Sequence, residues 1–520
     1  MSVVANRAYN GCSRTVQAFW LALANLLSVS ATFIIAAVLS RVMPPDDYGT
    51  YRQVIFVYYT LLIVFSCGLP RAYSYFLARV PIEEGRDVVC RLSIALIAFA
   101  SIFSASLFFG ADVIAHALGN VALAPNLRYF AVTPILLMPV LGVESILTVY
   151  GKTGFVAVYA LISRFFMIAG AVVPVIVFDA GVSGAVFGFV AASALSCAAG
   201  WKLAFLPFRG IVGVRTSISF REVASFVLPV FASGIYGFVI ASSSQFFVSR
   251  FFGVEAFAVF ANGYKELPFA NMAIVAVGGV LLPEFSRMFK ERTGAVGALE
   301  LYKGVIVKSA SLVYPLSIFC GFFALEIVIV LYGVFYSQSA ILFMLVTVVN
   351  LLRIVPCGSI LFATGNGGMF AKAHMATAVI IVMLDMACVC FFPSLWAIAL
   401  IGTCCTVCCI LWLMRGLARA LGVTFAALMP WWTMLKILVA SIAACMVVKL
   451  LCVLSILPSE GLAGLAVASL ACIVVFIPIA RLFKLDYSWL LTLAVHPLAR
   501  LGLVLQCRIG RIGRRQMPLK

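Results

Sequence analysis

The chain has 520 residues, of which 64% are hydrophobic and only 10% are charged, and its mean hydropathy is +1.17. Soluble domains are about half apolar and carry roughly 25% charged residues. A soluble core cannot bury this much apolar sequence. The composition therefore excludes a soluble protein and predicts an all-α protein that crosses a membrane many times.

Apolar runs long enough to cross a bilayer follow one another along the whole chain. A helix needs about 20 residues to cross, because each residue rises only about 1.5 Å. The runs are continuous and lack the alternation of a transmembrane barrel, so helices are expected. The first run is too long for the core of a signal peptide, and we expect it to be retained. Fourteen spans are predicted, near residues 16–39, 53–70, 92–111, 128–149, 155–178, 183–206, 223–248, 267–283, 304–332, 339–364, 373–393, 395–414, 431–456 and 461–480.

Positive charge is distributed unevenly among the loops between these spans. The loops on the N-terminal side of the membrane, together with both termini, contain 28 Lys and Arg residues, whereas the opposite loops contain six. Because Lys and Arg accumulate in cytoplasmic loops, both termini are expected to be cytoplasmic. The net charge of +18 is then mainly a signature of topology, with some attraction to anionic lipid. Nucleic-acid binding is not expected, because no soluble basic domain is present.

One polar bend occurs twice. LSRVMPPDDYGTYRQ at 39–53 joins the first two spans, and SRFFGVEAFAVFANGY at 249–264 joins the seventh and eighth. At a shift of 209 residues, Arg41 matches Arg250 and Tyr48 matches Phe257. Six spans separate the copies, so both halves enter the membrane in the same orientation, as parallel repeats do.

The repeat predicts two six-helix bundles, at 1–215 and 216–420, that face each other across a cleft. Two further helices at 421–485 and a basic cytoplasmic tail at 486–520 complete the chain. In transporters built from such halves, the cleft gives alternating access to a site near the middle of the membrane. The partly amphipathic tail is expected to lie on the membrane surface, held by anionic lipid. Docking of polysaccharide synthesis machinery on the tail is the alternative.

Three short motifs resemble those of a known family. PPDDYGTY at 44–51, GLPRA at 68–72 and GVSGAVFG at 181–188 are similar to the polysaccharide-transport branch of the multidrug/oligosaccharidyl-lipid/polysaccharide exporter superfamily. The resemblance covers roughly residues 15–420 by layout. It implies a flippase in the bacterial inner membrane, which translocates an undecaprenyl-diphosphate-linked oligosaccharide repeat unit for surface polysaccharide or exopolysaccharide synthesis.

Four ionisable side chains fall inside predicted spans: Glu144, Arg164, Arg353 and Asp385. A charge at the centre of a bilayer costs about 2.5–3.5 kcal/mol on the insertion scale, so it usually faces a cavity or a partner. We expect Arg164 and Arg353 to attract the anionic diphosphate in the cleft, and Glu144 or Asp385 to carry coupling ions. The alternative is a pair of buried ion pairs between neighbouring helices, one in each half.

Two more arginines, Arg41 and Arg250, end predicted helices at the periplasmic rim. They are expected to contact a gate or the substrate headgroup, and the alternative is that they extend to the membrane interface as ordinary snorkelling residues. Gly184 and Gly188 are four residues apart within one predicted span. This spacing of small residues predicts close packing against a neighbouring helix.

Other classes of function lack their sequence signatures. YGKTG at 150–154 is not a P-loop, because Ile146 stands where the first glycine is needed. The three histidines are scattered without metal-site spacing, and most of the sixteen cysteines lie in predicted spans, where a thiol packs as an apolar group. We therefore expect no cofactor and no enzymatic activity. An ion-coupled drug or cation antiporter of the same superfamily and a membrane polysaccharide polymerase stay open as alternatives.

Overall fold

The computed structural model describes residues 14–265, 295–355, 357–363, 366–458, 460–485 and 487, and in this part of the chain every regular element is helical. Among the described residues, ten helical stretches are long and apolar enough to cross a membrane. The bent pair α3 (Pro45–Ser66) and α4 (Leu69–Leu77) adds an eleventh if it is counted as one span. The all-α, multi-pass architecture is therefore confirmed.

The predicted count of fourteen spans is not confirmed. The expected span at 267–283 lies outside the described residues. The expected span at 339–364 is divided into α17 (Ser339–Arg353) and the short α18 (Cys357–Ala363). The predicted span at 223–248 lies inside one helix, α12 (Phe220–Phe252).

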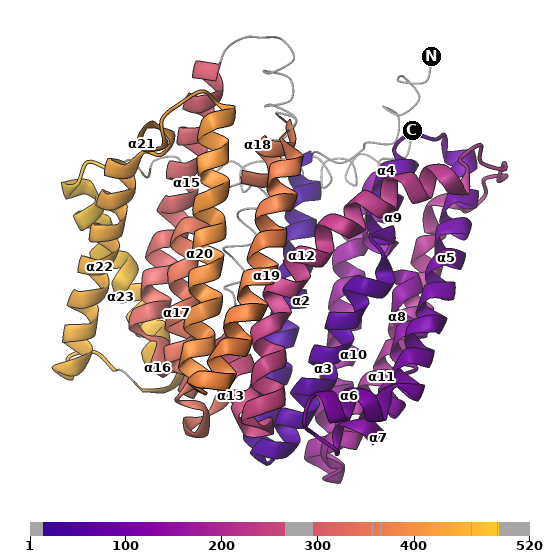
Figure 1. Ribbon diagram of the computed structural model, residues 1–520, viewed down its shortest axis with the longest axis horizontal. Helices are drawn as coiled ribbons and strands as arrows, with labels where there is room; N and C mark the ends of the chain where they lie inside the picture. Colours follow the sequence, from indigo (N-terminus) through magenta and orange to yellow (C-terminus); the bar gives the residue numbers. More distant parts are fainter. Residues whose placement is uncertain are drawn as a thin grey trace, which may run out of the picture.

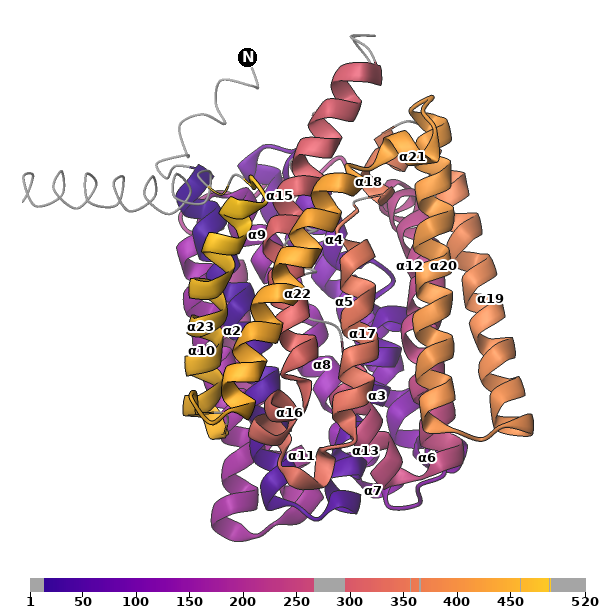
Figure 2. The ribbon, with the colours of Figure 1, turned by 90° about the vertical axis from the view of Figure 1, so that its left-hand side faces the viewer.

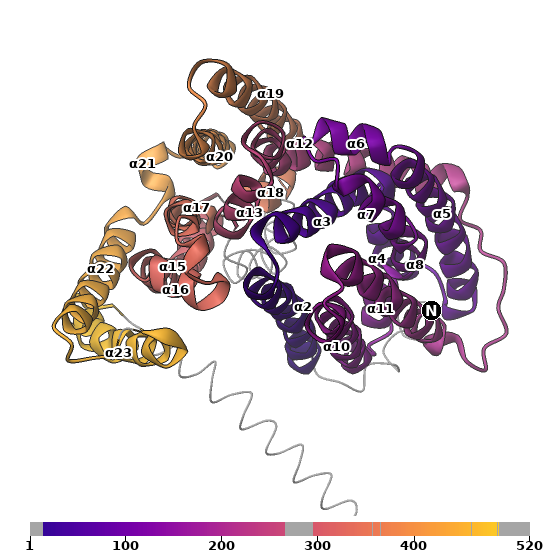
Figure 3. The same ribbon diagram turned by 90° about the horizontal axis from the view of Figure 1, so that it is seen from below.

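The helices form two groups that follow each other in the chain (Figure 1). We call α2–α11 the first half and α12–α20 the second half. The view along the helices in Figure 3 shows α2, α10 and α11 side by side in the first half, in agreement with their contacts. The first half contains α2 (Arg14–Val42), α3, α4, α5 (Ile82–Phe109), α6 (Ala111–Ala117), α7 (Leu123–Phe130), α8 (Thr133–Leu137), α9 (Val143–Val149), α10 (Thr153–Phe178) and α11 (Gly181–Ala204).

The second half is followed by helices that pack on its outer flank. Figure 2 shows α22 beside α15 and α23 beyond α22, both away from α19; the contacts place α23 on α22 and α16. The second half contains α12, α13 (Val254–Gly263), α15 (Ala295–Phe322), α16 (Ala324–Tyr332), α17, α18, α19 (Gly367–Phe391) and α20 (Leu395–Ala420). After it come α21 (Phe425–Leu428), α22 (Trp431–Val453) and α23 (Gly461–Leu482).

The order and length of the helices repeat between the halves. The helices α5 and α15 are both 28 residues long, and each is followed after one residue by a short helix, α6 or α16. The bend between α2 and α3 has its counterpart between α12 and α13, but the two turns use different chemistry. Pro44 and Pro45 start α3, because proline has a fixed φ that suits a helix start. Gly253 has a φ of 88° before α13, which favours glycine.

Two spans of the first half are broken. The axis bends by 47° between α3 and α4, where Cys67 and Gly68 both have positive φ values. The predicted span at 128–149 is divided among α7, α8, a single turn at Met138–Val140 and α9, and Pro134 and Pro139 each begin a new segment. Proline removes a backbone donor and cannot continue a regular helix. Local sequence thus explains both breaks.

Close packing of α10 on α11 depends on two glycines. A Cβ atom at Gly188 would lie 1.8 Å from the carbonyl oxygen of Gly170, so a side chain at this position would force the helices apart. The predicted packing role of the small residues at 184 and 188 is confirmed. In a membrane such backbone approach is a main source of helix association, because lipid provides little hydrophobic driving force between helices.

Candidate functional site

The two copies of the repeated bend lie against each other at one end of the helices, at the bottom of Figure 1. The buried hydroxyl of Tyr48 donates a 2.6 Å hydrogen bond to Oδ1 of Asn262. Gly49 lies so close to α13 that a Cβ there would be 2.5 Å from the carbonyl oxygen of Val254. We call this contact between residues 39–53 and 249–264 the end seal.

A chain of buried polar side chains runs through the end seal. Asn120 donates to Oε1 of Gln53 at 2.6 Å, and Nε2 of Gln53 donates to Oγ of Ser249 at 2.8 Å. The hydroxyl of Ser249 in turn donates to the carbonyl oxygen of Leu118 at 3.3 Å. Buried polar groups are costly unless they are satisfied, and a satisfied network specifies one arrangement of its helices. This network therefore fixes how the first half meets α12.

Arg41 and Arg250 make mirrored contacts across the end seal. Arg41 in α2 donates to the carbonyl oxygens of Ile329, at 3.1 Å, and Val330 in α16. Arg250 in α12 donates to the carbonyl oxygen of His116 in α6 at 2.9 Å. The acceptors lie in the last turns of the two short helices, where the helix carries partial negative charge. Each arginine thus joins one half to the C-terminal end of a short helix in the other half.

Arg52 and Lys265 form a cationic pair at the edge of the end seal: Arg52 belongs to the first bend, and Lys265 directly follows the second. Arg52 donates to the carbonyl oxygen of Ala261 at 2.5 Å and lies close enough to Lys265 to act on it electrostatically. The Lys265 ammonium lies 4.2 Å from the ring centroid of Phe33 in α2, a distance typical of a cation–π contact. Both side chains are half-buried, and no carboxylate in the described part of the chain lies within ion-pair distance of either.

Arg164 and Glu144 lie near each other in the first half without forming an ion pair. Nε of Arg164 donates to the hydroxyl of Ser28 in α2 at 3.1 Å. The Arg164 guanidinium acts electrostatically on the exposed Glu144 carboxylate, although no contact within 4.0 Å joins them. The structure therefore places these two predicted site residues near each other, but the ion pair that the alternative predicted between their helices is not formed.

The structure places Asp385 against α12. Its side chain is fully buried in α19, and Oδ2 accepts hydrogen bonds from the hydroxyls of Ser243 at 2.8 Å and Ser244 at 3.2 Å. Its second oxygen, Oδ1, has no hydrogen-bond partner in the described part of the chain. Arg353, which the sequence suggested as a partner, is half-buried at the C-terminal end of α17. A one-sided, buried carboxylate of this kind can bind a proton or a small cation.

The opposite end of the molecule holds the two halves differently. The ring of Tyr75 in α4 stacks on Phe226 in α12 with the centroids 4.1 Å apart, and the Arg79 guanidinium lies 3.7 Å from the Tyr75 centroid. The connection between the halves follows α5, where the amide of Thr216 donates to Oδ2 of Asp87 at 2.9 Å. Aromatic stacking therefore joins the halves here, in contrast to the hydrogen bonds of the end seal.

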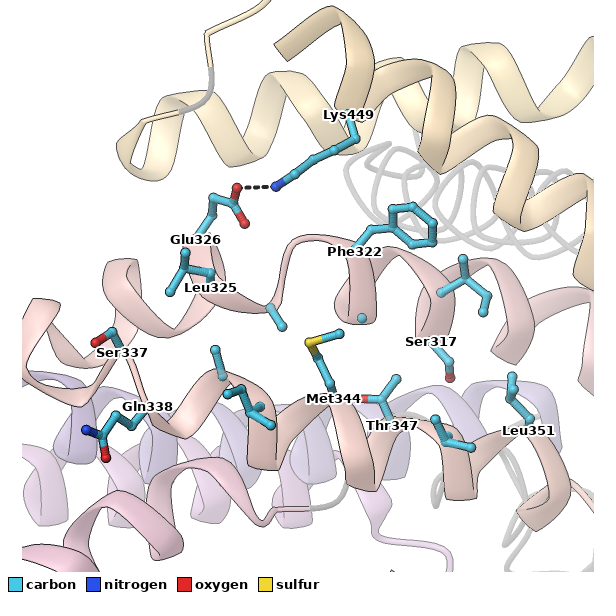
Figure 4. Close-up of a pocket in the computed structure, with 16 residues that line it drawn as sticks. Ser317, Phe322, Leu325, Glu326, Ser337, Gln338, Met344, Thr347, Leu351 and Lys449 are labelled. Atoms are coloured by element: carbon cyan, nitrogen blue, oxygen red, sulfur yellow. Dashed lines mark hydrogen bonds and ion pairs between the residues drawn. The ribbon is translucent and has the colours of Figure 1, made fainter. Parts of the chain in front are cut away.

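A lateral pocket of about 790 Å³ lies between α15, α16, α17 and α22. Figure 4 shows Lys449 of α22 paired with Glu326 at the start of α16, at the edge of a mainly apolar wall that includes Phe322 and Met344. The Lys449 ammonium also lies 4.8 Å from the ring centroid of Phe323. The ion pair joins α22 to α16, and α22 also packs on α15. The pocket is separate from the cationic pair.

Comparison with known proteins decides the family. A family model described as "Polysaccharide biosynthesis protein" matches residues 16–289, which is more than half of the chain. The chain belongs to this family. No curated protein matches it. The family assignment confirms the resemblance drawn from the three short motifs.

Solved structures share the fold of this polysaccharide biosynthesis protein. The lipid II flippase MurJ in an inward closed conformation is 15% identical with a TM-score of 0.67, covering 90% of this chain and 98% of that chain. An inward-facing multidrug resistance MATE transporter of the MOP superfamily is 14% identical with a TM-score of 0.60, covering 78% of this chain and 99% of that chain. An outward-facing MATE structure, also 14% identical, has a TM-score of 0.52 and covers 78% of this chain and 96% of that chain. At these identities the likeness shows the fold alone.

Sequence patterns do not single out the cationic pair. Arg52 and Lys265 each lie at the edge of an apolar run, where a cation is typical of a loop end. Arg52 is one helical turn beyond Tyr48 in the first bend, and Lys265 directly follows the second bend. The repeat itself was therefore the signal that could have brought them together.

Proposed function

We propose that this protein is a flippase of the bacterial inner membrane that translocates an undecaprenyl-diphosphate-linked oligosaccharide repeat unit. The observation that carries the proposal is the position of Arg52 and Lys265 where the two halves meet. Arg52 donates to the carbonyl oxygen of Ala261, a few residues before Lys265, and the Lys265 ammonium lies against Phe33 of α2. Two cations close together repel each other, and burial makes their separation from water costly. An anion that binds between them removes both penalties.

A diphosphate supplies the anion that this pair requires. Its oxygens accept the several donors of a guanidinium in a planar arrangement, and a lysine adds a compact positive charge. We propose that Arg164 and Arg353 are further cations of the passage and that Glu144 lies beside Arg164 as a modulating acid. Arg41 and Arg250, which donate to helix carbonyls, are proposed as gate residues rather than as direct substrate ligands.

Alternating access would follow from the repeat. We propose the bundle boundaries near residues 215 and 420, with the end seal on the periplasmic side and both termini in the cytoplasm, as the excess of Lys and Arg favours. The hydrogen bonds of the end seal would then break when the passage opens outward, and the Tyr75–Phe226 contact would close the inner end. The two halves would rock about the cationic pair.

Ion coupling is proposed at Asp385. The buried carboxylate has one oxygen held by two serines and one without a hydrogen-bond partner, so a bound proton or cation would complete its environment. Asp385 belongs to α19, and its two serine partners belong to α12, the helix that also carries Arg250. Ion binding could therefore bias the same helix that closes the end seal.

An ion-coupled drug or cation antiporter is the second candidate, and the same buried Asp385 favours it. The two candidates differ in the charge of their substrates. A cationic drug would be repelled by Arg52 and Lys265, whereas an anionic lipid diphosphate would be attracted. We favour the flippase for this reason. A polymerase, which would be an enzyme, is disfavoured by the short external loops of the sequence.

Deletion of the gene in its host tests the proposal. A flippase predicts loss of surface polysaccharide or exopolysaccharide together with accumulation of lipid-linked repeat units on the inner leaflet. Full-length units accumulating on the outer leaflet would instead indicate a polymerase. A change in drug sensitivity with normal polysaccharide would contradict the flippase and support the antiporter. Complementation with the unaltered chain controls for effects on neighbouring genes.

A further inference from the structure

A second cationic site lies at the end of the helices opposite the end seal. Arg415 and Arg419 are one turn apart on α20 and line a niche of about 520 Å³. Figure 2 shows α19 and α20 side by side, with α21 at the same end of α20. We propose that this niche binds the headgroup and one acyl chain of an anionic phospholipid.

Within the part of the chain that the structure describes, no acidic side chain pairs with the two arginines of the niche. Arg415 and Arg419 are both exposed. Side chains four residues apart on a helix are neighbours, about 5–6 Å apart at their Cβ atoms. Two guanidinium groups at this spacing can donate to the oxygens of one phosphodiester, and arginine is suited to this because its donors form a rigid fork.

The rest of the lining is apolar and continues along the helices into the membrane. Leu411 and Cys408 lie one and two turns before Arg415 on α20, and Met369 at the start of α19 closes the side. Trp412 is 45% exposed, and Phe425 of α21 lies on the other edge. Indole rings are typical of the membrane–water interface, where one side is apolar and the other is wet. A soluble phosphate would use only the arginines, whereas a phospholipid would also cover this apolar floor.

The niche differs from the proposed substrate site in place and in exposure. Arg52 and Lys265 lie at the edge of the end seal and are half-buried, whereas Arg415 and Arg419 are exposed near the C-terminal end of α20, at the other end of the bundle. On the orientation proposed above, the lipid would come from the cytoplasmic leaflet. Basic pockets between helices on that side are suited to anionic headgroups. Bound lipid would link α19, α20 and α21, and so steady the second half on the side away from the first.

Native mass spectrometry of the purified full-length chain tests the proposal. The protein is titrated with phosphatidylglycerol and, separately, with phosphatidylcholine of the same acyl chains. We expect a high-affinity phosphatidylglycerol adduct that phosphatidylcholine does not replace. The double variant Arg415→Ala and Arg419→Ala should bind phosphatidylglycerol about thirtyfold more weakly, as expected for the loss of two cations near a lipid surface.

Two further variants separate this site from general charge effects. Arg209→Ala with Arg221→Ala removes two other exposed arginines near the same end and should leave the adduct unchanged. Arg415→Lys with Arg419→Lys keeps the charge and should retain most of the binding. Equal loss in the Arg209 and Arg221 control, no preference for the anionic headgroup, or displacement of the lipid by millimolar inorganic phosphate would each overturn the proposal. None of these readouts depends on transport, so the result is independent of the proposed flippase activity.

Discussion

Arg41 and Arg250 hold the two halves together in opposite directions. Arg41 of the first half donates to the end of α16, and Arg250 of the second half donates to the end of α6. The two residues occupy matched positions of the repeated bend, 209 residues apart. The bend therefore encodes more than a helix end, because each copy supplies one arginine that contacts the other half; we call these two contacts the latch. On the proposed gate role, opening at this end would require both contacts to release.

Loss of either latch arginine should loosen the end seal. Arg41→Ala and Arg250→Ala each remove a charge-assisted hydrogen bond, and because both side chains are exposed the effect is expected at about 0.5–1.5 kcal/mol. Hydrogen–deuterium exchange of the amides in residues 254–263 should become roughly two- to tenfold faster in each variant. The control is Arg128→Ala, which removes an exposed ion pair with Asp112 at the same end but within the first half. Unchanged exchange in both latch variants would contradict the assignment.

The close approach at Gly49 gives a sharper test of the same interface. Gly49→Ala places a Cβ 2.5 Å from the carbonyl oxygen of Val254, and neither backbone can move far without disturbing the Tyr48–Asn262 hydrogen bond. We expect destabilisation of about 1–3 kcal/mol and a lower Tm. The matched variant is Gly154→Ala, because Gly154 is also helical and has no atom within 4 Å of its Cβ position. Equal melting temperatures for the two variants would contradict the conclusion that the contact between Gly49 and Val254 is too close for a side chain.

Transport should depend on positive charge at Arg52 and Lys265. Arg52→Ala and Lys265→Ala should each reduce complementation of a deletion strain at least tenfold, because the proposed diphosphate substrate would lose one of its two cationic contacts. Lys265→Arg should retain activity, while Lys265→Glu should abolish it. The measurement is surface polysaccharide together with inner-leaflet lipid-linked units, at matched protein levels in the membrane. Full activity of the Lys265→Glu variant would refute the anion site.

Replacing Asp385 with a neutral side chain should remove ion coupling without destabilising the fold. Asp385→Asn keeps an oxygen that can accept from Ser243 and Ser244 but removes the charge. We expect an unchanged or higher Tm, since an unpaired buried carboxylate is costly. Transport should lose its response to the sodium or proton gradient. Asp179→Asn serves as the control, because Asp179 is exposed after the end of α10. A variant that still responds to both gradients would rule out Asp385 as the coupling acid.

Removing one partner of the Glu326–Lys449 ion pair should destabilise the protein, because the remaining charge is partly buried and has lost its partner. Lys449→Met leaves the Glu326 carboxylate without its partner, and since the two side chains are only 21% and 33% exposed we expect a loss of roughly 1–3 kcal/mol. The double variant Glu326→Gln with Lys449→Met should recover most of that loss. Thermal unfolding in detergent measures both. If the double variant is as unstable as the single one, the attachment of α22 depends on packing in the pocket rather than on charge.

Much of the architecture could be predicted from the sequence. Twenty apolar residues in a row can satisfy their backbone groups in lipid only as a helix, so composition and run length determined an all-helical, multi-pass chain. Prolines and glycines explain the bend after α2 and the break in the span at 128–149, because their effects are local. Gly188 packs closely against α10, as its spacing from Gly184 predicts. The correspondence of Arg41 with Arg250 can be read from the repeated bend alone.

Only the tertiary structure decided which distant residues meet. Asp385 lies against Ser243 and Ser244, because α12 and α19 pack side by side, a relation that no local pattern contains. The cationic pair of Arg52 and Lys265 depends on the register of α3 against α13, which is set by the glycine contact at Gly49 and by buried hydrogen bonds. Such contacts join residues from 141 to 214 positions apart. Periodicity along one helix carries no information about how its neighbour is rotated. The sequence alone therefore determined the helical, membrane-spanning class and the repeated bend, whereas the tertiary structure showed where spans break and decided which distant side chains meet.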